Sequence, residues 1–183
     1  MKLHSTASVR KRGSGREFDP YLAKLDPGDK AACLKCHAVY HNKHWSLPSP
    51  PRSNGSRRLI NRERTLAQPP ERKILCPACQ KIRDHFPMGI VTLKGDYVQK
   101  HRGEILNLIH NEESRARGFN PLERLISVYD QEDALIVETT TEKLAQRIGS
   151  RLQHSYKGDV RYKWSRQNRF IRVDWERNLE PER

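Results

Sequence analysis

Two short cysteine pairs are the residues of this chain best suited to chemistry. The stretch CLKCHAVYHNKHW at residues 33–45 holds two of the four cysteines and three of the eight histidines, and CPAC at residues 76–79 holds the other two cysteines. Two C-x-x-C pairs supply four thiolates, which form a common ligand set for tetrahedral zinc. We therefore predict one zinc ion, held by Cys33, Cys36, Cys76 and Cys79.

The distance between the pairs leaves a second ligand set open. Thirty-nine residues separate Cys36 from Cys76, against about 15–20 in a compact zinc ribbon. A site in which His41 or His44 replaces one cysteine is therefore an alternative. A zinc-knuckle spacing is less suitable, because its fourth ligand would fall on Ser46.

Other chemistries fit the cysteines less well. CLKCH has the spacing of a haem attachment site, but that chemistry needs export, and the N-terminal residues lack the apolar stretch of a secretory signal. A thioredoxin-like redox site needs a βαβ pattern near the cysteines. A catalytic zinc needs an open ligand position and a nearby base, and HNKH is not the H-E-x-x-H motif. We expect no enzymatic activity and no small-molecule substrate.

The positive charge is concentrated in one half of the chain. The formal net charge is +13, of which residues 1–94 carry +12 and residues 95–183 carry +1. Such asymmetry is typical of contact with a polyanion, because basic side chains that neutralise phosphates release condensed counterions. No run approaches the roughly 20 apolar residues that span a bilayer, so we expect a cytoplasmic protein with reduced thiols and no membrane partner.

The composition predicts a small core joined to polar segments, since the apolar fraction is only 35%. We expect a basic flexible tail at 1–18, a zinc-ribbon-like module at 19–94, an α+β domain at 95–178 and a short tail at 179–183. A basic insert at 46–73, with prolines near both ends, interrupts the module and accounts for the separation of the cysteine pairs.

Alternating patterns and helix caps predict the order αββαββ for residues 95–178. A helix begins at Asp96 and ends at Gly118, and a second begins near Thr139 with Glu142 in a capping box. RLISVYD, ALIVETT, VRYKW and RFIRVDW read as strands of an antiparallel sheet. Trp164 and Trp175 are expected to lie partly buried on this sheet. The fold class is therefore α+β.

Candidate nucleic-acid contacts lie near the first cysteine pair, in the insert and on one predicted strand. Imidazole and indole rings stack on bases, and guanidinium groups bond phosphate oxygens in pairs. These candidates are His41, Lys43, His44, Trp45, Arg57, Arg58, Arg62, Arg64, Arg161 and Lys163.

The segments CLKCHAVYHNKHW, CPACQKIRDHFPMG and ETTTEKLAQRIG together resemble a largely uncharacterised family of short bacterial zinc-binding proteins, over most of residues 20–178. More distantly, the chain is similar to the archaeal and eukaryotic adaptor for nuclear export of the large ribosomal subunit. That adaptor also has N-terminal C-x-x-C knuckles before a small α+β domain, but it has more pairs and binds more than one zinc. The resemblance implies association with the ribosome or ribosomal RNA, without the export role.

We expect a non-enzymatic RNA-binding protein of the ribosome that serves assembly, hibernation or rescue. A zinc-dependent DNA-binding regulator is the main alternative, although no helix-turn-helix or C₂H₂ pattern is present. A zinc enzyme that acts on nucleic acid fits less well, because four cysteine ligands exclude water from the metal.

Overall fold

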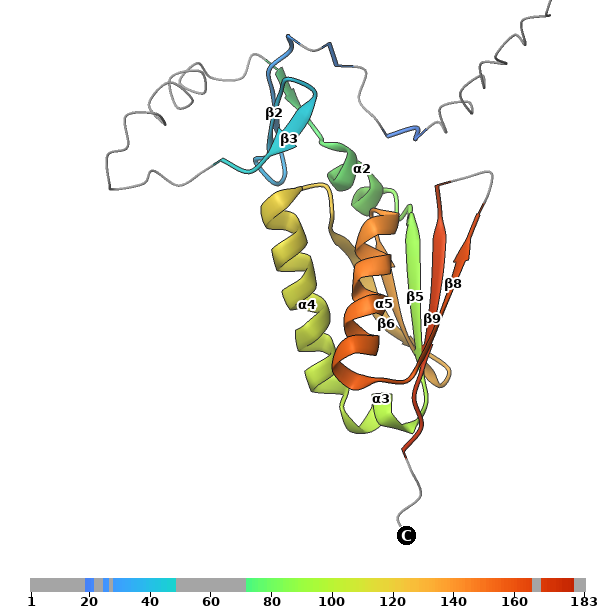
Figure 1. Cartoon of the computed structure of the whole chain (residues 1–183). Coiled ribbons are helices and arrows are strands. Elements are labelled where there is room, and N and C mark those ends of the chain that lie inside the picture. The colour runs from blue at the N-terminus through green and yellow to red at the C-terminus, as the bar shows by residue number, and fades with distance from the viewer. Residues whose placement is uncertain (1–18, 22–24, 27, 49–71, 166–168, 180–183) are drawn as a thin grey trace, which may run out of the picture.

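The described part of the chain is a mixed α+β structure built around two sheets (Figure 1). It is a computed structural model that describes residues 19–21, 25–26, 28–48, 72–165 and 169–179. The predicted tail at 1–18 lies outside the described residues, as do Arg57, Arg58, Arg62 and Arg64.

The described residues of the N-terminal unit form a small four-stranded sheet and one helix. Its strands have the order β3-β2-β1-β4, in which β1 and β4 run parallel and the other pairs run antiparallel. Asn42 and Lys43 join β2 to β3 with φ angles of 48° and 65°, as a tight two-residue hairpin turn requires. The elements are β1 (Ala31–Cys33), β2 (Val39–His41), β3 (His44–Ser46), β4 (Arg72–Ile74) and α2 (Pro77–Arg83).

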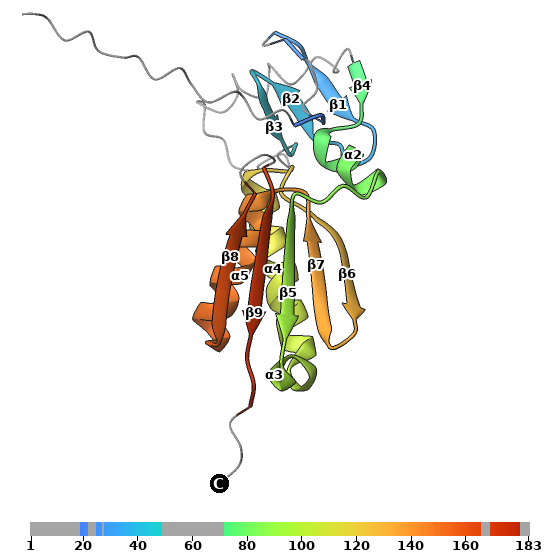
Figure 2. The ribbon, with the colours of Figure 1, turned by 90° about the vertical axis from the view of Figure 1, so that its right-hand side faces the viewer.

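The C-terminal unit is a five-stranded sheet with helices on one face (Figure 2). Its strand order is β6-β7-β5-β9-β8; β5 and β9 run parallel, and the other neighbours run antiparallel. The N-terminal unit lies at the end of the sheet where β5 begins and β7 ends. The elements are β5 (Gly89–Lys94), α3 (Asp96–Lys100), α4 (Arg102–Phe119), β6 (Leu125–Gln131), β7 (Ala134–Thr139), α5 (Glu142–Tyr156), β8 (Asp159–Trp164) and β9 (Ile171–Glu176).

The α+β class is confirmed, and within residues 95–178 the elements follow the predicted order αββαββ, except that the first helix is divided into α3 and α4. The purely antiparallel sheet is wrong. The strand β5 was not predicted; it pairs antiparallel with β7 on one side and parallel with β9 on the other, and the sheet is therefore mixed. Val91 and Leu93 of this strand are fully buried, whereas Ile90 and Thr92 lie on the other face. The central strand of this sheet therefore begins at Gly89, within the range 19–94 that was expected to belong to the zinc-ribbon-like module.

Three further details differ from the expectation. The helix predicted from Asp96 is broken at His101, which has φ −112° and whose ring stacks on Tyr97 with 4.1 Å between centroids. The cap of α5 is Thr141, whose side chain accepts from the backbone N–H of Leu144. Trp175 is completely buried, whereas Trp164 is 53% exposed. Trp175 is held by a bond of 2.8 Å from its indole N–H to the carbonyl of Lys157.

A glycine allows α5 to approach the sheet closely. A Cβ added at Gly149 would lie 2.5 Å from Cγ1 of Val173 on β9, well inside van der Waals contact. Gly103, in the exposed first turn of α4, has nothing within 4 Å of the same position. The two glycines therefore test packing against intrinsic helix propensity.

We expect Gly149→Ala to destabilise the protein by about 1–3 kcal/mol, because overpacking outweighs the gain in helix propensity. Gly103→Ala, the matched control, should stabilise by up to about 1 kcal/mol. Urea unfolding followed by circular dichroism measures both. Equal effects of the two substitutions would contradict the close packing of α5 on β9.

The central position of β5 predicts how the C-terminal unit behaves in isolation. A fragment of residues 88–179 should unfold cooperatively without metal, because it retains Val91 and Leu93 in the core. A fragment of residues 96–179 lacks the strand to which β7 and β9 bond and should remain unfolded. Thermal unfolding by circular dichroism separates the two fragments, and a folded shorter fragment would show that β5 is dispensable.

Candidate metal centre

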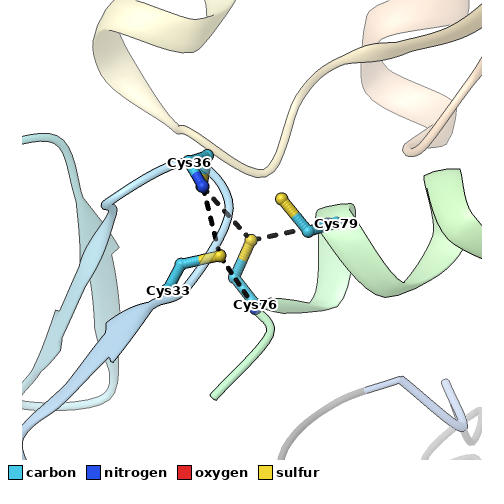
Figure 3. A group of neighbouring side chains, drawn as sticks. All are labelled: Cys33, Cys36, Cys76 and Cys79. Atoms are coloured by element: carbon cyan, nitrogen blue, oxygen red, sulfur yellow. Dashed lines mark hydrogen bonds between the residues drawn. The ribbon is translucent and has the colours of Figure 1, made fainter. Parts of the chain in front are cut away.

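The parallel pairing of β1 and β4 brings the two cysteine pairs together. Cys33 ends β1 and is in register with Ile74, the last residue of β4. The N–H of Leu34 also donates to the carbonyl of Ile74, at 3.0 Å. Because the parallel strands β1 and β4 end on the same side of the sheet, the two cysteine loops that follow them lie next to each other (Figure 3).

The first loop is a tight knuckle whose backbone faces a sulfur. The N–H groups of Lys35 and Cys36 donate to Sγ of Cys33, at 3.4 and 3.5 Å. Cys33 also bonds Ala38 through the backbone at 2.8 Å, and His37 adopts a φ of 60° to close the turn. This geometry aims the first sulfur pair towards α2.

The second pair sits at the start of a helix. Cys76 is the N-cap of α2, and its Sγ accepts from the N–H of Cys79 at 3.5 Å. Pro77 occupies the first turn, where its fixed φ suits a helix and its missing N–H is no loss. The N–H of Cys76 donates across to Sγ of Cys33 at 3.4 Å, and this bond links the two pairs directly.

The four sulfurs are spaced as ligands of one metal ion. All four Sγ atoms lie within 4.8 Å of one another, and those of Cys36 and Cys76 are 3.6 Å apart. Tetrahedral ligands with Zn–S bonds of about 2.3 Å have edges of about 3.8 Å. All four are free thiols, and three of them are buried. The arrangement is compatible with a single metal site.

The thiols differ in their electrostatic surroundings. Burial raises the pKa of Cys79 to about 11, although the hydrogen bond with Cys76 acts to lower it, and burial also raises the pKa of Cys76. Burial acts to raise the pKa of Cys33 as well, but the backbone N–H groups of Cys36, Cys76 and Lys35 together outweigh it and lower this pKa to about 6. A metal ion must therefore displace protons from the second pair, so its affinity falls in acid.

A cation from the C-terminal unit also contacts the cluster. Nη1 of Arg124 donates to Sγ of Cys79 at 3.4 Å. Sequence reasoning missed this residue, because Arg124 lies 45 positions from Cys79 in an unremarkable stretch before β6. Arg124 reaches Cys79 only because the C-terminal unit packs against the N-terminal unit.

The predicted histidine ligands lie elsewhere. His41 and His44 face each other across the β2–β3 hairpin, and the group of four cysteines contains neither of them. On the opposite face of this hairpin, Tyr40 and Trp45 pack ring to ring with centroids 5.5 Å apart. Trp45 also packs against the cysteine cluster, so much of its indole ring is occupied by packing.

The described nucleic-acid candidates form two separate sets. Lys43 and His44 are exposed at the hairpin of the N-terminal unit. Arg161 and Lys163 are exposed on β8, on the face of the five-stranded sheet without helices, where Lys163 forms an ion pair of 2.9 Å with Asp174. Those predicted contacts that fall on described residues therefore do not form one patch.

Comparison of the chain with protein-family models, with curated proteins and with solved structures finds no match. Among the described residues, every helix is too short or too polar to cross a bilayer.

We expect the full chain to bind one Co²⁺ ion with the thiolate-to-metal charge-transfer absorption of a tetrahedral sulfur site. Cys76→Ser should weaken this binding by more than about 100-fold, because it removes one of four thiolate ligands while serine can still cap α2. His41→Ala is the control, and it should leave the absorption spectrum unchanged. A spectrum that responds to His41→Ala but not to Cys76→Ser would contradict the four-cysteine assignment.

Proposed function

We propose that this chain is a non-enzymatic zinc protein that binds RNA and acts on the ribosome. The observation that carries the proposal is the distribution of charge, +12 in residues 1–94 against +1 in the remainder. The cysteine cluster lies in the basic half, and the metal would serve to present that half to a polyanion.

Zinc is the metal that suits this ligand set best. Four thiolates in tetrahedral spacing favour zinc over oxygen-seeking ions such as Mg²⁺ or Ca²⁺. Four protein ligands would also leave no position for water or substrate, which is characteristic of a structural site rather than a catalytic one. A closed four-thiolate site of this kind supports a zinc-ribbon-like module without enzymatic activity.

The topology of the N-terminal unit supports a role for the arginine-rich insert. The insert leaves the unit after β3 and returns at β4, and both strands belong to the same four-stranded sheet. A metal ion bound at the end of β4 would fix the point of return and lower the entropic cost of presenting the insert's basic side chains. Such contacts would position the protein on a phosphate backbone without reading sequence.

The ribosome is the polyanion favoured by the resemblance to the bacterial zinc-binding family and to the export adaptor. Ribosomal RNA is also the most abundant polyanion in the cytoplasm where reduced thiols are expected. Assembly, hibernation and rescue factors all fit this description. Basic side chains release counterions from DNA in a similar way. The experiments must therefore distinguish an RNA-binding protein from a DNA-binding regulator.

We expect replacement of Arg57, Arg58, Arg62 and Arg64 by Ala to weaken binding to RNAs of unrelated sequence. The slope of log K against log salt should flatten by about 3, since each lost phosphate contact contributes about 0.7–0.9. The matched control replaces four cations of the C-terminal helices, Lys100, Arg102, Arg115 and Lys143, and should leave the slope unchanged. Equal slopes for the two variants would show that the insert does not contact phosphate.

Co-sedimentation of tagged protein with ribosomes on sucrose gradients tests the partner itself. The protein should migrate with a ribosomal fraction, and RNase but not DNase should release it. Release by DNase alone would favour the DNA-binding regulator and overturn the ribosomal proposal.

A further inference from the structure

The cysteine cluster would be negatively charged when loaded, because four thiolates outnumber the two positive charges of zinc. A buried negative centre is stabilised by nearby donors and cations, and such partners commonly set the affinity of a metal site. Backbone N–H groups already donate to Cys33 and Cys76. The one charged side chain with a bond to the cluster, among the described residues, is Arg124.

The guanidinium of Arg124 has no competing acidic partner in the part of the chain that the structure describes. No carboxylate forms an ion pair with it there, although arginines at 83, 102, 115, 147, 151 and 169 all have one. Its Nε is also buried without a hydrogen-bond acceptor. A half-buried cation without a counter-charge is costly, so the thiolates of a loaded site would supply what the protein otherwise lacks.

The backbone of Arg124 is fixed to the end of β7. Its N–H donates to Oγ1 of Thr140 at 2.8 Å, and its carbonyl accepts from the N–H of Thr140 at 2.9 Å. The same hydroxyl donates to the carbonyl of Leu122 at 2.6 Å, and Leu122 packs against the cysteine cluster. Arg124 is therefore held by the C-terminal unit while it reaches into the N-terminal one.

A second cation crosses the same junction beside Arg124. Lys81 of α2 is 4% exposed, and its Nζ donates to the carbonyl of Thr140 at 3.3 Å and to Oδ2 of Asp19 at 2.7 Å. Thr140 thus contacts both the helix that carries Cys79 and the residue that bonds Cys79. Metal binding at Cys79 could therefore affect the five-stranded sheet through two contacts, from Cys79 to Arg124 and from Arg124 to Thr140.

We propose that Arg124 is the counter-charge of the metal centre and couples metal binding to docking of the two units. Zinc would create the negative charge that Arg124 neutralises, and this would tighten the junction at Thr140. By linkage, docking would raise the affinity for zinc by the same factor. The inference rests on the proposed metal site but not on RNA binding.

The test compares full-length Arg124→Gln with Arg124→Lys and wild type. Arg124→Gln should bind zinc about tenfold more weakly in chelator competition. With Co²⁺ in the site, its thiolate-to-metal band should move to lower energy, because a lost N–H···S bond leaves the sulfur electrons less stabilised. Arg124→Lys retains the charge and should bind zinc more tightly than Arg124→Gln. Arg115→Gln, which alters a paired arginine of α4, is the matched control and should equal wild type.

Hydrogen exchange measures the coupling itself. Zinc should slow exchange at the amides of Arg124 and Thr140 by about tenfold in wild type and in Arg115→Gln, but much less in Arg124→Gln. Circular dichroism checks that each variant remains folded. If wild type binds no metal, the metal site and this inference are both overturned. If wild type binds zinc and Arg124→Gln matches Arg115→Gln in affinity, cobalt band and exchange, only the role of Arg124 is overturned.

Discussion

The parallel pairing of β1 with β4 is the constraint on which the rest of the structure depends. Two strands of three residues each cannot contribute much stability alone, and the N-terminal core consists mainly of the cysteines, Ala38 and Ala78. The pairing of these strands nevertheless places the two C-x-x-C loops side by side, although the loops lie far apart in sequence. A core this small needs a further source of free energy, and a structural metal is the usual one in units of this size.

The C-terminal unit supplies what the small unit lacks. In its large apolar core, the inner faces of β5, β7 and β9 pack against α4 and α5. Beyond the end of β7, Thr140 and Arg124 contact residues of α2. The buried pair of Lys81 with Asp19 adds polar contacts that are costly to break once buried. The two units therefore meet through specific polar bonds, which hold α2 against the end of the five-stranded sheet.

Sequence alone predicted the elements whose patterns are local. Alternation and helix caps predicted both hairpins of the C-terminal unit and the helix that carries Leu144 and Ile148. The spacing of the cysteines predicted that all four would lie together. The strand β5 was missed because it lies within residues 19–94, the range expected for the metal-binding module, although Val91 and Leu93 alternate with more polar neighbours as a strand requires. Arg124 could not be predicted, because its contact with Cys79 exists only after two separately patterned units have docked.

X-ray absorption at the zinc edge of the purified full-length protein tests the central claim most directly. Four cysteine ligands predict four sulfur scatterers at about 2.3 Å and none at shorter distance. A nitrogen scatterer at about 2.0–2.1 Å would instead place a histidine in the site. Absence of zinc from protein purified without chelators would contradict the claim that a metal holds the two cysteine loops together.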